Sequence, residues 1–236
     1  MNLLQKSALI LPAIFMISVN ALHAQTDVNY DPKAKTILDD VSKTAKAYTS
    51  ITATFTVTTK HADGTSDVRN GNVVMSGGKY KIVLENTVKT VVYKDEYYND
   101  GKTTWVFVEK TGELTIDDAP LPGAAKGDAI SPNDLFTLHE KGFKYKFIKT
   151  DTVGGKVYQH IDLYPEKPDK KNYSIVHLTI DKSKKQITKV EMVNKDGSTT
   201  TYSITTFTAN LAVTDATFQF DATKHTVKST VDMRED

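Results

Sequence analysis

The sequence predicts a mainly β, single-domain protein with a few helices. Most of the chain beyond residue 50 alternates apolar and polar residues in short runs, and Gly- or Asp-containing turns separate these runs. Helical spacing of apolar residues is confined to two stretches. Roughly ten or eleven antiparallel strands in one domain favour a large curled sheet over a flat open one. With 236 residues, 39% of them hydrophobic, the chain can build one sizeable core.

The first 24 residues resemble a secretory signal peptide. Lys6 precedes an apolar run, Ala8–Val19, and the small residue Ala24 stands before Gln25. The apolar run is short for a bilayer span, which disfavours the alternative of an uncleaved membrane anchor. We therefore expect export, cleavage near Ala24, and one domain over residues 25–236.

Composition excludes several functions. The chain has no cysteine, so a cysteine nucleophile, a thiolate metal site and an acylated N-terminal cysteine are excluded, and the core must hold the exported chain without disulfides. The formal net charge is +1, and the lysines are scattered among acidic residues. Nucleic-acid binders show a clustered basic patch, which is missing from this sequence.

The first helix is predicted over Pro32–Tyr48. Asp31 is a suitable N-cap and Pro32 suits the first helical position. Its apolar residues recur at helical spacing and form one stripe along the helix. They are Ala34, Ile37, Leu38, Val41, Ala45 and Tyr48. We expect this helix to pack behind the sheet.

The strands begin with "ITATFTVTTK", in which Ile51, Ala53, Phe55 and Val57 alternate with threonines. Further strands are predicted at Gly71–Ser76, Lys79–Asn86, Thr90–Lys94, Thr103–Lys110, Leu114–Ile116, Phe143–Lys149, Lys156–Leu163, Ser174–Asp181, Gln186–Asn194 and Thr200–Thr208, with a last short strand in the C-terminal tail.

A second helix is predicted in the middle of the strands. After a Gly-, Ala- and Pro-rich loop over 117–130, Ser131 can cap, Pro132 fits the first turn, and Asp134 can complete a capping box. The apolar residues of this helix are Leu135, Phe136 and Leu138.

Signs of catalysis are few. The sequence lacks the HExxH, GxSxG, P-loop and GxGxxG patterns. His160 and His177 lie on predicted strands, where they are most simply polar strand residues. Adjacent acids such as Asp117 and Asp118 diverge in direction and form no dyad by themselves. We predict no enzymatic activity, no cofactor and no metal site.

Several strands are apolar on both sides. Trp105 and Phe107 point one way, and Val106 and Val108 the other. A sheet with one face in water does not need this pattern. Either further protein or an apolar ligand must cover the second face, so a closed sandwich and a ligand-binding sheet both remain open.

The order of the motifs resembles the LolA family of outer-membrane lipoprotein carrier proteins over nearly the whole mature chain. The matching segments are "ITATFTV", "GNVVMSGGKYKIVLEN", "YNDGKTTWVFVEKTGEL", "ISPNDLFTL" and "ATFQFD". One departure is that the family's basic residue next to a proline, which helps to latch its lid helices, is absent. Lys79 is the candidate replacement.

The resemblance implies an incomplete antiparallel β-barrel whose concave face is covered by helices. It further implies a periplasmic chaperone, a monomer, that receives acylated lipoproteins from an ATP-driven inner-membrane release complex and delivers them to the outer membrane or an acceptor there. The alternative is a regulatory sensor of lipids or lipoproteins built on the same half-barrel. The expected acyl-binding residues are Phe55, Tyr80, Ile82, Leu84, Trp105, Phe107, Leu135, Phe136, Leu138, Leu178, Ile180, Val190 and Met192.

Overall fold

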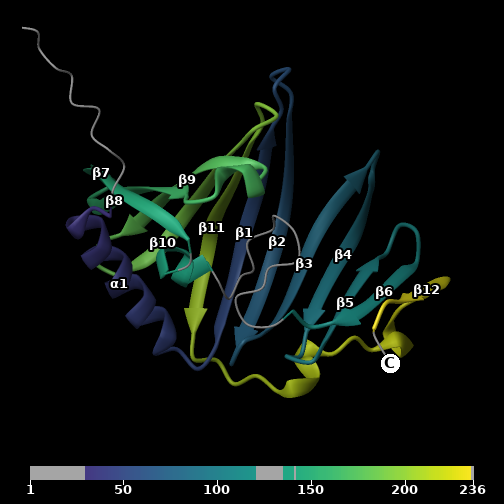
Figure 1. Ribbon diagram of the computed structural model, residues 1–236. Coiled ribbons are helices and arrows are strands. Elements are labelled where there is room, and N and C mark those ends of the chain that lie inside the picture. The colour runs from purple at the N-terminus through teal and green to yellow at the C-terminus, as the bar shows by residue number, and fades with distance from the viewer. Residues whose placement is uncertain (1–29, 121–134, 141, 235–236) are drawn as a thin grey trace, which may run out of the picture.

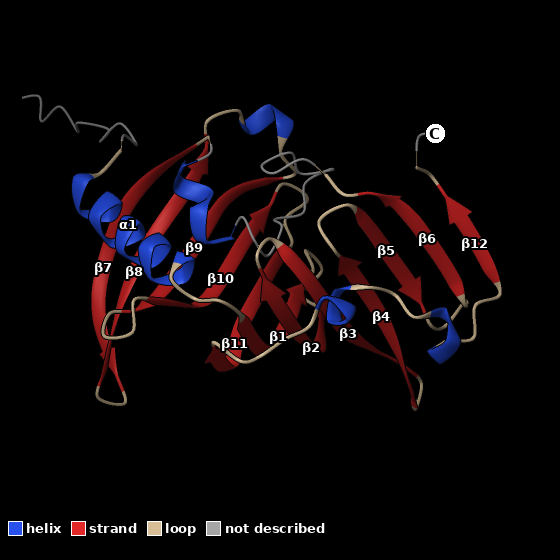
Figure 2. Ribbon diagram, turned by 90° about the horizontal axis from the view of Figure 1, so that it is seen from below, coloured by secondary structure: helices blue, strands red, loops and turns tan. Residues whose placement is uncertain are grey.

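The computed structural model is one twelve-stranded sheet curled into an unclosed barrel (Figures 1 and 2). The structure describes residues 30–120, 135–140 and 142–234. The strand order is β12-β6-β5-β4-β3-β2-β1-β11-β10-β9-β8-β7, and every pairing is antiparallel except that of β12 with β6. The mainly β half-barrel predicted from the sequence is therefore confirmed. The predicted signal segment lies outside the described residues.

Two antiparallel meanders make up the sheet. The first contains β1 (Ile51–Lys60), β2 (Ser66–Ser76), β3 (Lys79–Val88), β4 (Val91–Asn99), β5 (Thr103–Val108) and β6 (Glu113–Asp118). The second contains β7 (Phe143–Val153), β8 (Lys156–Pro165), β9 (Tyr173–Asp181), β10 (Gln186–Asn194) and β11 (Thr199–Ala209). Pairing of β1 with β11 joins them, and β12 (Ser229–Asp232) adds an edge to the first meander.

Helix α1 (Pro32–Lys46) covers the concave face of the second meander (Figure 2). Asp31 caps it by accepting hydrogen bonds from the backbone N–H groups of Lys33 and Ala34. Its buried residues Ala34, Leu38 and Val41 join a core with apolar side chains of β7–β10. The expectation that this helix lies behind the sheet is wrong: its apolar stripe packs on the same face as the second helical element.

That second element is η1 (Leu135–Glu140), a 3-10 helix. The predicted helix start at Ser131, Pro132 and Asp134 lies outside the described residues. Leu138 is buried in the core beneath α1, and the half-buried Phe136 contacts both this core and the apolar side chains of β1–β3. Thus η1 lies where the two halves of the concave face meet.

The chain after β11 crosses the convex side of the first meander. In Figure 1 it is the yellow segment that runs below the sheet towards β12. It contains the short 3-10 helices η3 (Asp215–Phe218) and η4 (Ala222–Lys224); a third, η2 (Pro168–Lys170), lies between β8 and β9. The Phe220 ring lies 5.8 Å from that of Tyr98 and 5.4 Å from that of Phe107. The C-terminal segment therefore supplies the second layer over β4 and β5.

Candidate functional site

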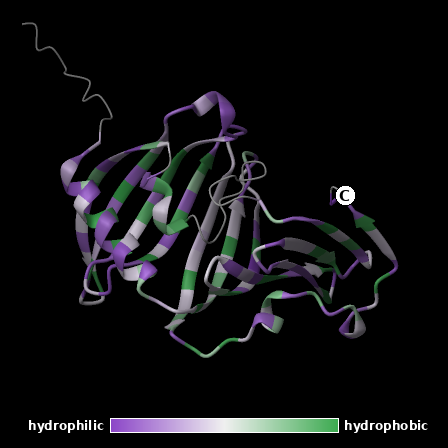
Figure 3. Ribbon diagram, turned by 60° about the horizontal axis from the view of Figure 1, so that its bottom comes forward, coloured by the Kyte–Doolittle hydropathy of each residue, from purple (hydrophilic) through white to green (hydrophobic). Residues whose placement is uncertain are grey.

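The concave face of the first meander carries apolar side chains. The buried residues of α1 pack on the second meander and do not cover them. The register of β1, β2 and β3 aligns Phe55 with Gly71 and Leu84, and Ala53 with Val73 and Ile82. We call the following side chains the concave apolar surface: Ile51, Ala53, Phe55, Val57, Val73, Met75, Tyr80, Ile82, Leu84, Ile204 and Phe207. Figure 3 shows hydrophobic positions recurring along the strands of this half of the sheet.

A glycine shapes the centre of this surface. A Cβ built on Gly71 would lie 2.6 Å from two ring atoms of Phe55 and 2.8 Å from Cδ2 of Leu84. The Phe55 ring therefore extends over the backbone of β2, in the space that a side chain at position 71 would occupy. A strand glycine commonly marks a close approach of this kind. The result is an aromatic platform facing the concave side.

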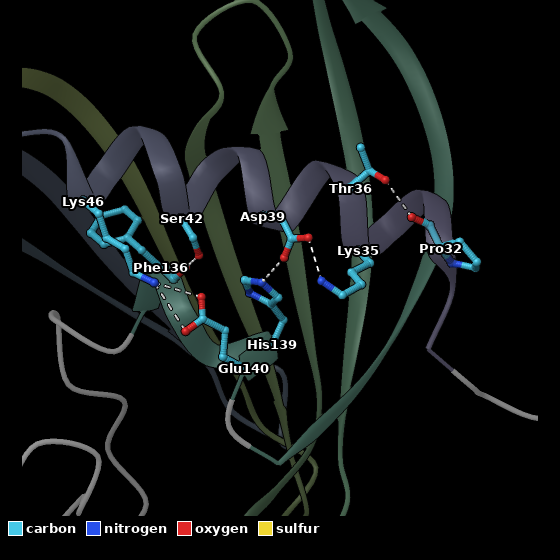
Figure 4. A network of polar contacts seen from close by, with 9 residues as sticks. All are labelled: Pro32, Lys35, Thr36, Asp39, Ser42, Lys46, Phe136, His139 and Glu140. Atoms are coloured by element: carbon cyan, nitrogen blue, oxygen red, sulfur yellow. Dashed lines mark hydrogen bonds and ion pairs between the residues drawn. The ribbon is translucent and has the colours of Figure 1, made fainter.

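Polar contacts hold η1 against α1 (Figure 4). The Ser42 hydroxyl donates to the backbone carbonyl of Phe136. Nε2 of His139 lies 3.1 Å from Oδ1 of Asp39, and Nζ of Lys46 lies 3.0 Å from Oε1 of Glu140. These contacts come from successive turns of one helix face, so they fix η1 along the length of α1.

The Asp39 carboxylate is the charged centre of this network. The ammonium of Lys35, 2.7 Å away, and the imidazole of His139 hold the pKa of Asp39 below its usual range. His139 is 9% exposed, whereas Lys46 and Glu140 have well exposed side chains. Exposed ion pairs contribute little to stability, so the buried contacts of Ser42 and His139 are the stronger part of the connection.

A shallow surface hollow lies beside this network. The residues that line it are Asp39, Ser42, Lys43, Lys46, Ala47 and Glu140, four of which carry a charged group. Charged walls disfavour an acyl chain, because desolvating them has no compensating contact. The hollow is thus distinct in chemistry from the concave apolar surface.

The predicted acyl-binding residues fall into three groups. Phe55, Tyr80, Ile82 and Leu84 belong to the concave apolar surface, and Phe136 touches its edge. A second group lies in the core under α1 and η1 and consists of Leu135, Leu138, Leu178, Ile180, Val190 and Met192. Leu178 and Ile180 are 1% and 0% exposed and pack under the helices, and Phe55 of the first group is itself buried, at 8% exposed.

Trp105 and Phe107 form the third group, and their predicted position was wrong. The register aligns Trp105 with Tyr98 and Val106 with Tyr97, and Tyr97 aligns in turn with Ile82. Val106 thus shares the face of Ile82, and Trp105 and Phe107 point to the convex side. There Phe107 packs against Phe220 and His225. The second apolar face of this strand is covered by protein, namely the C-terminal segment.

The proposed role of Lys79 in a lid latch is also corrected. Its Nζ lies 2.7 Å from Oδ1 of Asp215, at the start of η3. Lys79 therefore joins β3 to the C-terminal segment. The contacts that hold η1 come from α1 instead. In the sequence, the spacing of Asp39, Ser42 and Lys46 is that of an ordinary solvated helix face, so it did not indicate these contacts.

Sequence reasoning missed part of the concave apolar surface. Val57, Val73 and Met75 are at most 8% exposed on it, and Ile204 and Phe207 of β11 complete it. The alternation in β1 already placed Val57 with Phe55. The contributions of β2 and β11 follow from cross-strand register, which the alternation of a single strand does not reveal.

Two further observations concern metal-binding side chains and membrane-spanning helices. Among residues 30–120, 135–140 and 142–234, there is no group of three or more His, Asp or Glu side chains arranged to hold a metal ion. Within the same ranges, no helix combines the length and apolar character needed to cross a membrane.

The fold and the site define a class of protein: an open antiparallel half-barrel with helices on its concave face and an apolar surface beside them. A family model described as "Uncharacterized protein" matches residues 84–230, more than half of the chain, and the chain belongs to that family. No curated protein matches the sequence.

Solved structures share the fold at low sequence identity. An uncharacterized conserved protein from Thermus thermophilus is 13% identical, with a TM-score of 0.54 over 86% of this chain and 99% of that one. A LolA superfamily protein from Nitrosomonas europaea is 13% identical (TM-score 0.42; 79% and 97% covered). LprF from Mycobacterium bovis is 17% identical (TM-score 0.45; 79% and 97% covered). These likenesses concern the fold and say nothing about ligand or partner.

Proposed function

We propose that the protein is a periplasmic, non-catalytic carrier that binds the acyl chains of lipoproteins on its concave apolar surface and moves them from the inner to the outer membrane. The observation that carries this proposal is that surface itself. Phe55 of β1 and Ile82 and Leu84 of β3 lie on the concave side, on either side of β2, and η1 lies at the margin of this surface. The motif order shared with the lipoprotein carrier family supports the same function.

The energetics favour a surface of this kind. An acyl chain of about 16 carbons costs on the order of 10 kcal/mol to expose to water, at about 0.8 kcal/mol per methylene. An apolar protein surface replaces the membrane interior for such a chain. Release requires that the contact be reversible, and a small element such as η1, held largely by its contacts with α1, can move at modest cost.

Partners follow from the same proposal. The carrier takes cargo from an ATP-driven release complex in the inner membrane and passes it to the outer membrane or to an acceptor there. No step needs a cofactor. A sensor would differ in one respect: it would bind acylated protein without removing it from a membrane.

A vesicle-extraction assay tests the proposal. The purified protein is mixed with vesicles that contain a fluorescent lipopeptide, and lipopeptide in the soluble fraction is measured after the vesicles are removed. A carrier extracts the lipopeptide in proportion to its own concentration and leaves the deacylated peptide unbound. Binding to the vesicle surface without extraction would favour the sensor, and no interaction with the acylated form would overturn both.

Two matched variants locate the site. Leu84→Gln places an amide on the concave apolar surface, between Gly71 and Asp95 in the register. Val68→Gln makes a comparable change at a position that is 65% exposed, on the convex side of the neighbouring strand. At equal folded fraction, the first variant should lose extraction and the second should keep it. Equal loss in both variants would place the acyl site elsewhere.

A further inference from the structure

Arg69 is a distinctive charge on the concave side of the first meander. The chain has two arginines, and its other permanently charged cationic side chains are lysines. In β1–β6 the register places a single lysine or arginine side chain on the concave face, that of Arg69, aligned with Val57. Lys79, Lys81 and Lys94 of the neighbouring strands lie on the convex face instead. The cation therefore borders the concave apolar surface and stands apart from the lysines.

The surroundings of Arg69 leave its guanidinium largely available. Nη1 donates to Oδ1 of Asn86 at 3.4 Å, a long hydrogen bond, and Asn86 donates in turn to the carboxylate of Asp95. The amide of Asn86 thus stands between the two charges. Within the described residues, no carboxylate lies within ion-pair distance of Arg69. A guanidinium has five N–H donors, so most of those of Arg69 have no acceptor among the residues that the structure describes.

The apolar residues beside Arg69 connect it to the proposed acyl site. Val57 of β1 is aligned with Arg69 of β2 on one side and with Tyr202 of β11 on the other. Val57 is 2% exposed and Tyr202 is 36% exposed. The Tyr202 ring lies 6.4 Å from the ring of Phe55. One step along β2, on the same face, Gly71 lies under Phe55. Aromatic and aliphatic side chains therefore lie between the Phe55 ring and the guanidinium of Arg69.

We propose that Arg69 binds the anionic head group of a lipid whose acyl chain lies on the concave apolar surface. This inference rests on the proposed function, since it requires acyl binding there, and it adds anionic lipids to the ligand class. Arginine suits the role because its planar fork pairs with phosphate or carboxylate through two hydrogen bonds. The low polarity of the adjacent surface strengthens such a contact relative to open water.

Binding of three matched probes tests the inference. They are monolauroylglycerol, its phosphate ester lauroyl lysophosphatidic acid, and glycerol phosphate without an acyl chain, each titrated by calorimetry below the micelle threshold. The wild-type protein should bind the phosphate ester about tenfold more tightly than the neutral lipid, as a charge-assisted contact allows. Glycerol phosphate alone should bind far more weakly than either lipid.

Two variants assign the preference to one side chain. Arg69→Gln should abolish the preference and leave the affinity for the neutral lipid unchanged. Lys94→Gln removes the same charge from the convex side of a neighbouring strand and should keep the preference. A preference that survives in Arg69→Gln, or is lost equally in Lys94→Gln, would overturn the inference.

The remaining outcomes separate the inference from the function on which it rests. Equal binding of both lipids by the wild-type protein would overturn the role of Arg69 and leave acyl binding intact. Tight binding of glycerol phosphate alone would show a free anion site and would also overturn it. If neither lipid binds, both the role of Arg69 and the proposed function are overturned. A wild-type salt titration needs no folded variant: the preference should shrink as salt rises, and a salt-independent preference would count against a charged contact.

Discussion

The Asp31 carboxylate accepts a hydrogen bond from the backbone N–H of Phe147 at 3.0 Å, and so connects the start of α1 to the edge strand β7. The same carboxylate caps the helix, and the backbone N–H of Asp31 donates to the carbonyl of Tyr145 at 3.1 Å. Asp31 thereby provides hydrogen-bond partners for backbone groups in the first turn of α1 and at the free edge of the sheet. Unpaired edges invite association with other chains, so this contact also protects the sheet.

Asp31→Asn should destabilise the protein by about 1–2 kcal/mol, because the amide can still cap the helix but no longer offers a carboxylate to all three donors. Urea denaturation at neutral pH measures the loss. Asp40→Asn on the same helix is the control. Asp40 pairs with Lys185 across two exposed side chains, so its replacement should cost well under about 1 kcal/mol. Equal losses would mean that the edge contact contributes nothing.

The contribution of Asp31 should depend on pH. Partial burial raises the pKa of Asp31, but the backbone N–H groups of Phe147, Ala34 and Lys33 outweigh it and hold the pKa below its usual range. Because the pKa is depressed in the folded state, the stabilisation is fully present above the unfolded pKa of about 3.9 and is lost as the pH falls through the folded pKa. The difference between wild type and Asp31→Asn should therefore shrink in acid. A constant difference down to about pH 2 would contradict this account.

Gly71→Ala should destabilise the protein by about 1–2 kcal/mol, since the new methyl group displaces the Phe55 ring and this outweighs the usual gain from replacing a strand glycine. The double variant with Phe55→Leu should lose less than the sum of the two single losses, because the smaller side chain vacates the space above position 71. Chemical denaturation of the four proteins gives the coupling. Additive losses would show that the two residues do not compete for space.

Ser42→Ala should loosen η1. The buried hydroxyl of Ser42 donates to the Phe136 carbonyl, and its removal should cost about 1 kcal/mol. Hydrogen exchange at the amides of Leu138 and His139 should accelerate, whereas amides of β9 should not change. Lys46→Gln, which removes an exposed ion pair with Glu140, should have little effect on either measurement. Faster exchange in Lys46→Gln alone would reverse this ranking.

Trp105 should be insensitive to an acyl ligand, because it faces the convex side. A tryptophan moved to the concave side, in the double variant Trp105→Phe and Tyr97→Trp, should change its emission when the lipopeptide binds. Tyr97 is aligned with Ile82 of the concave apolar surface. A response of native Trp105 without one at position 97 would place the ligand on the convex side, near the C-terminal segment.

The sequence predicted the strands well because alternation and turn residues are local. Each strand predicted between Ile51 and Thr208 overlaps one of the strands observed there, and Asp31 and Pro32 begin the first helix as expected. Curvature is a property of the whole sheet, so the alternation of Trp105 with Val106 could not show which side is concave. The covering residue Phe220 lies far along the chain, and no local pattern connects the two.

The site was predicted less completely for a related reason. Leu178 and Phe55 look alike in sequence, as apolar residues of alternating strands. In the structure Leu178 belongs to the core that α1 covers, whereas Phe55 is buried in the separate cluster of the concave apolar surface. Which half of a sheet a helix covers depends on the tertiary path of the chain. The Lys79 contact with Asp215 was unpredictable on the same grounds, because its partner follows the last strand of the second meander.

The central pairing of β1 with β11 has a consequence for the order of assembly. Thr54 and Thr206 meet across this pair although 152 residues separate them. Closing so long a loop is slow compared with forming the neighbouring hairpins, so we expect the two meanders to form first and to join late at the middle of the sheet. Until then β1, rich in β-branched residues, has an open edge that is prone to aggregation. Pulsed hydrogen exchange during refolding should protect the amides of β3 and β4 before the amides that bond between β1 and β11, and simultaneous protection would contradict this sequence of events. Substitutions in β11 would then reduce the yield of folded protein more than their effect on final stability suggests.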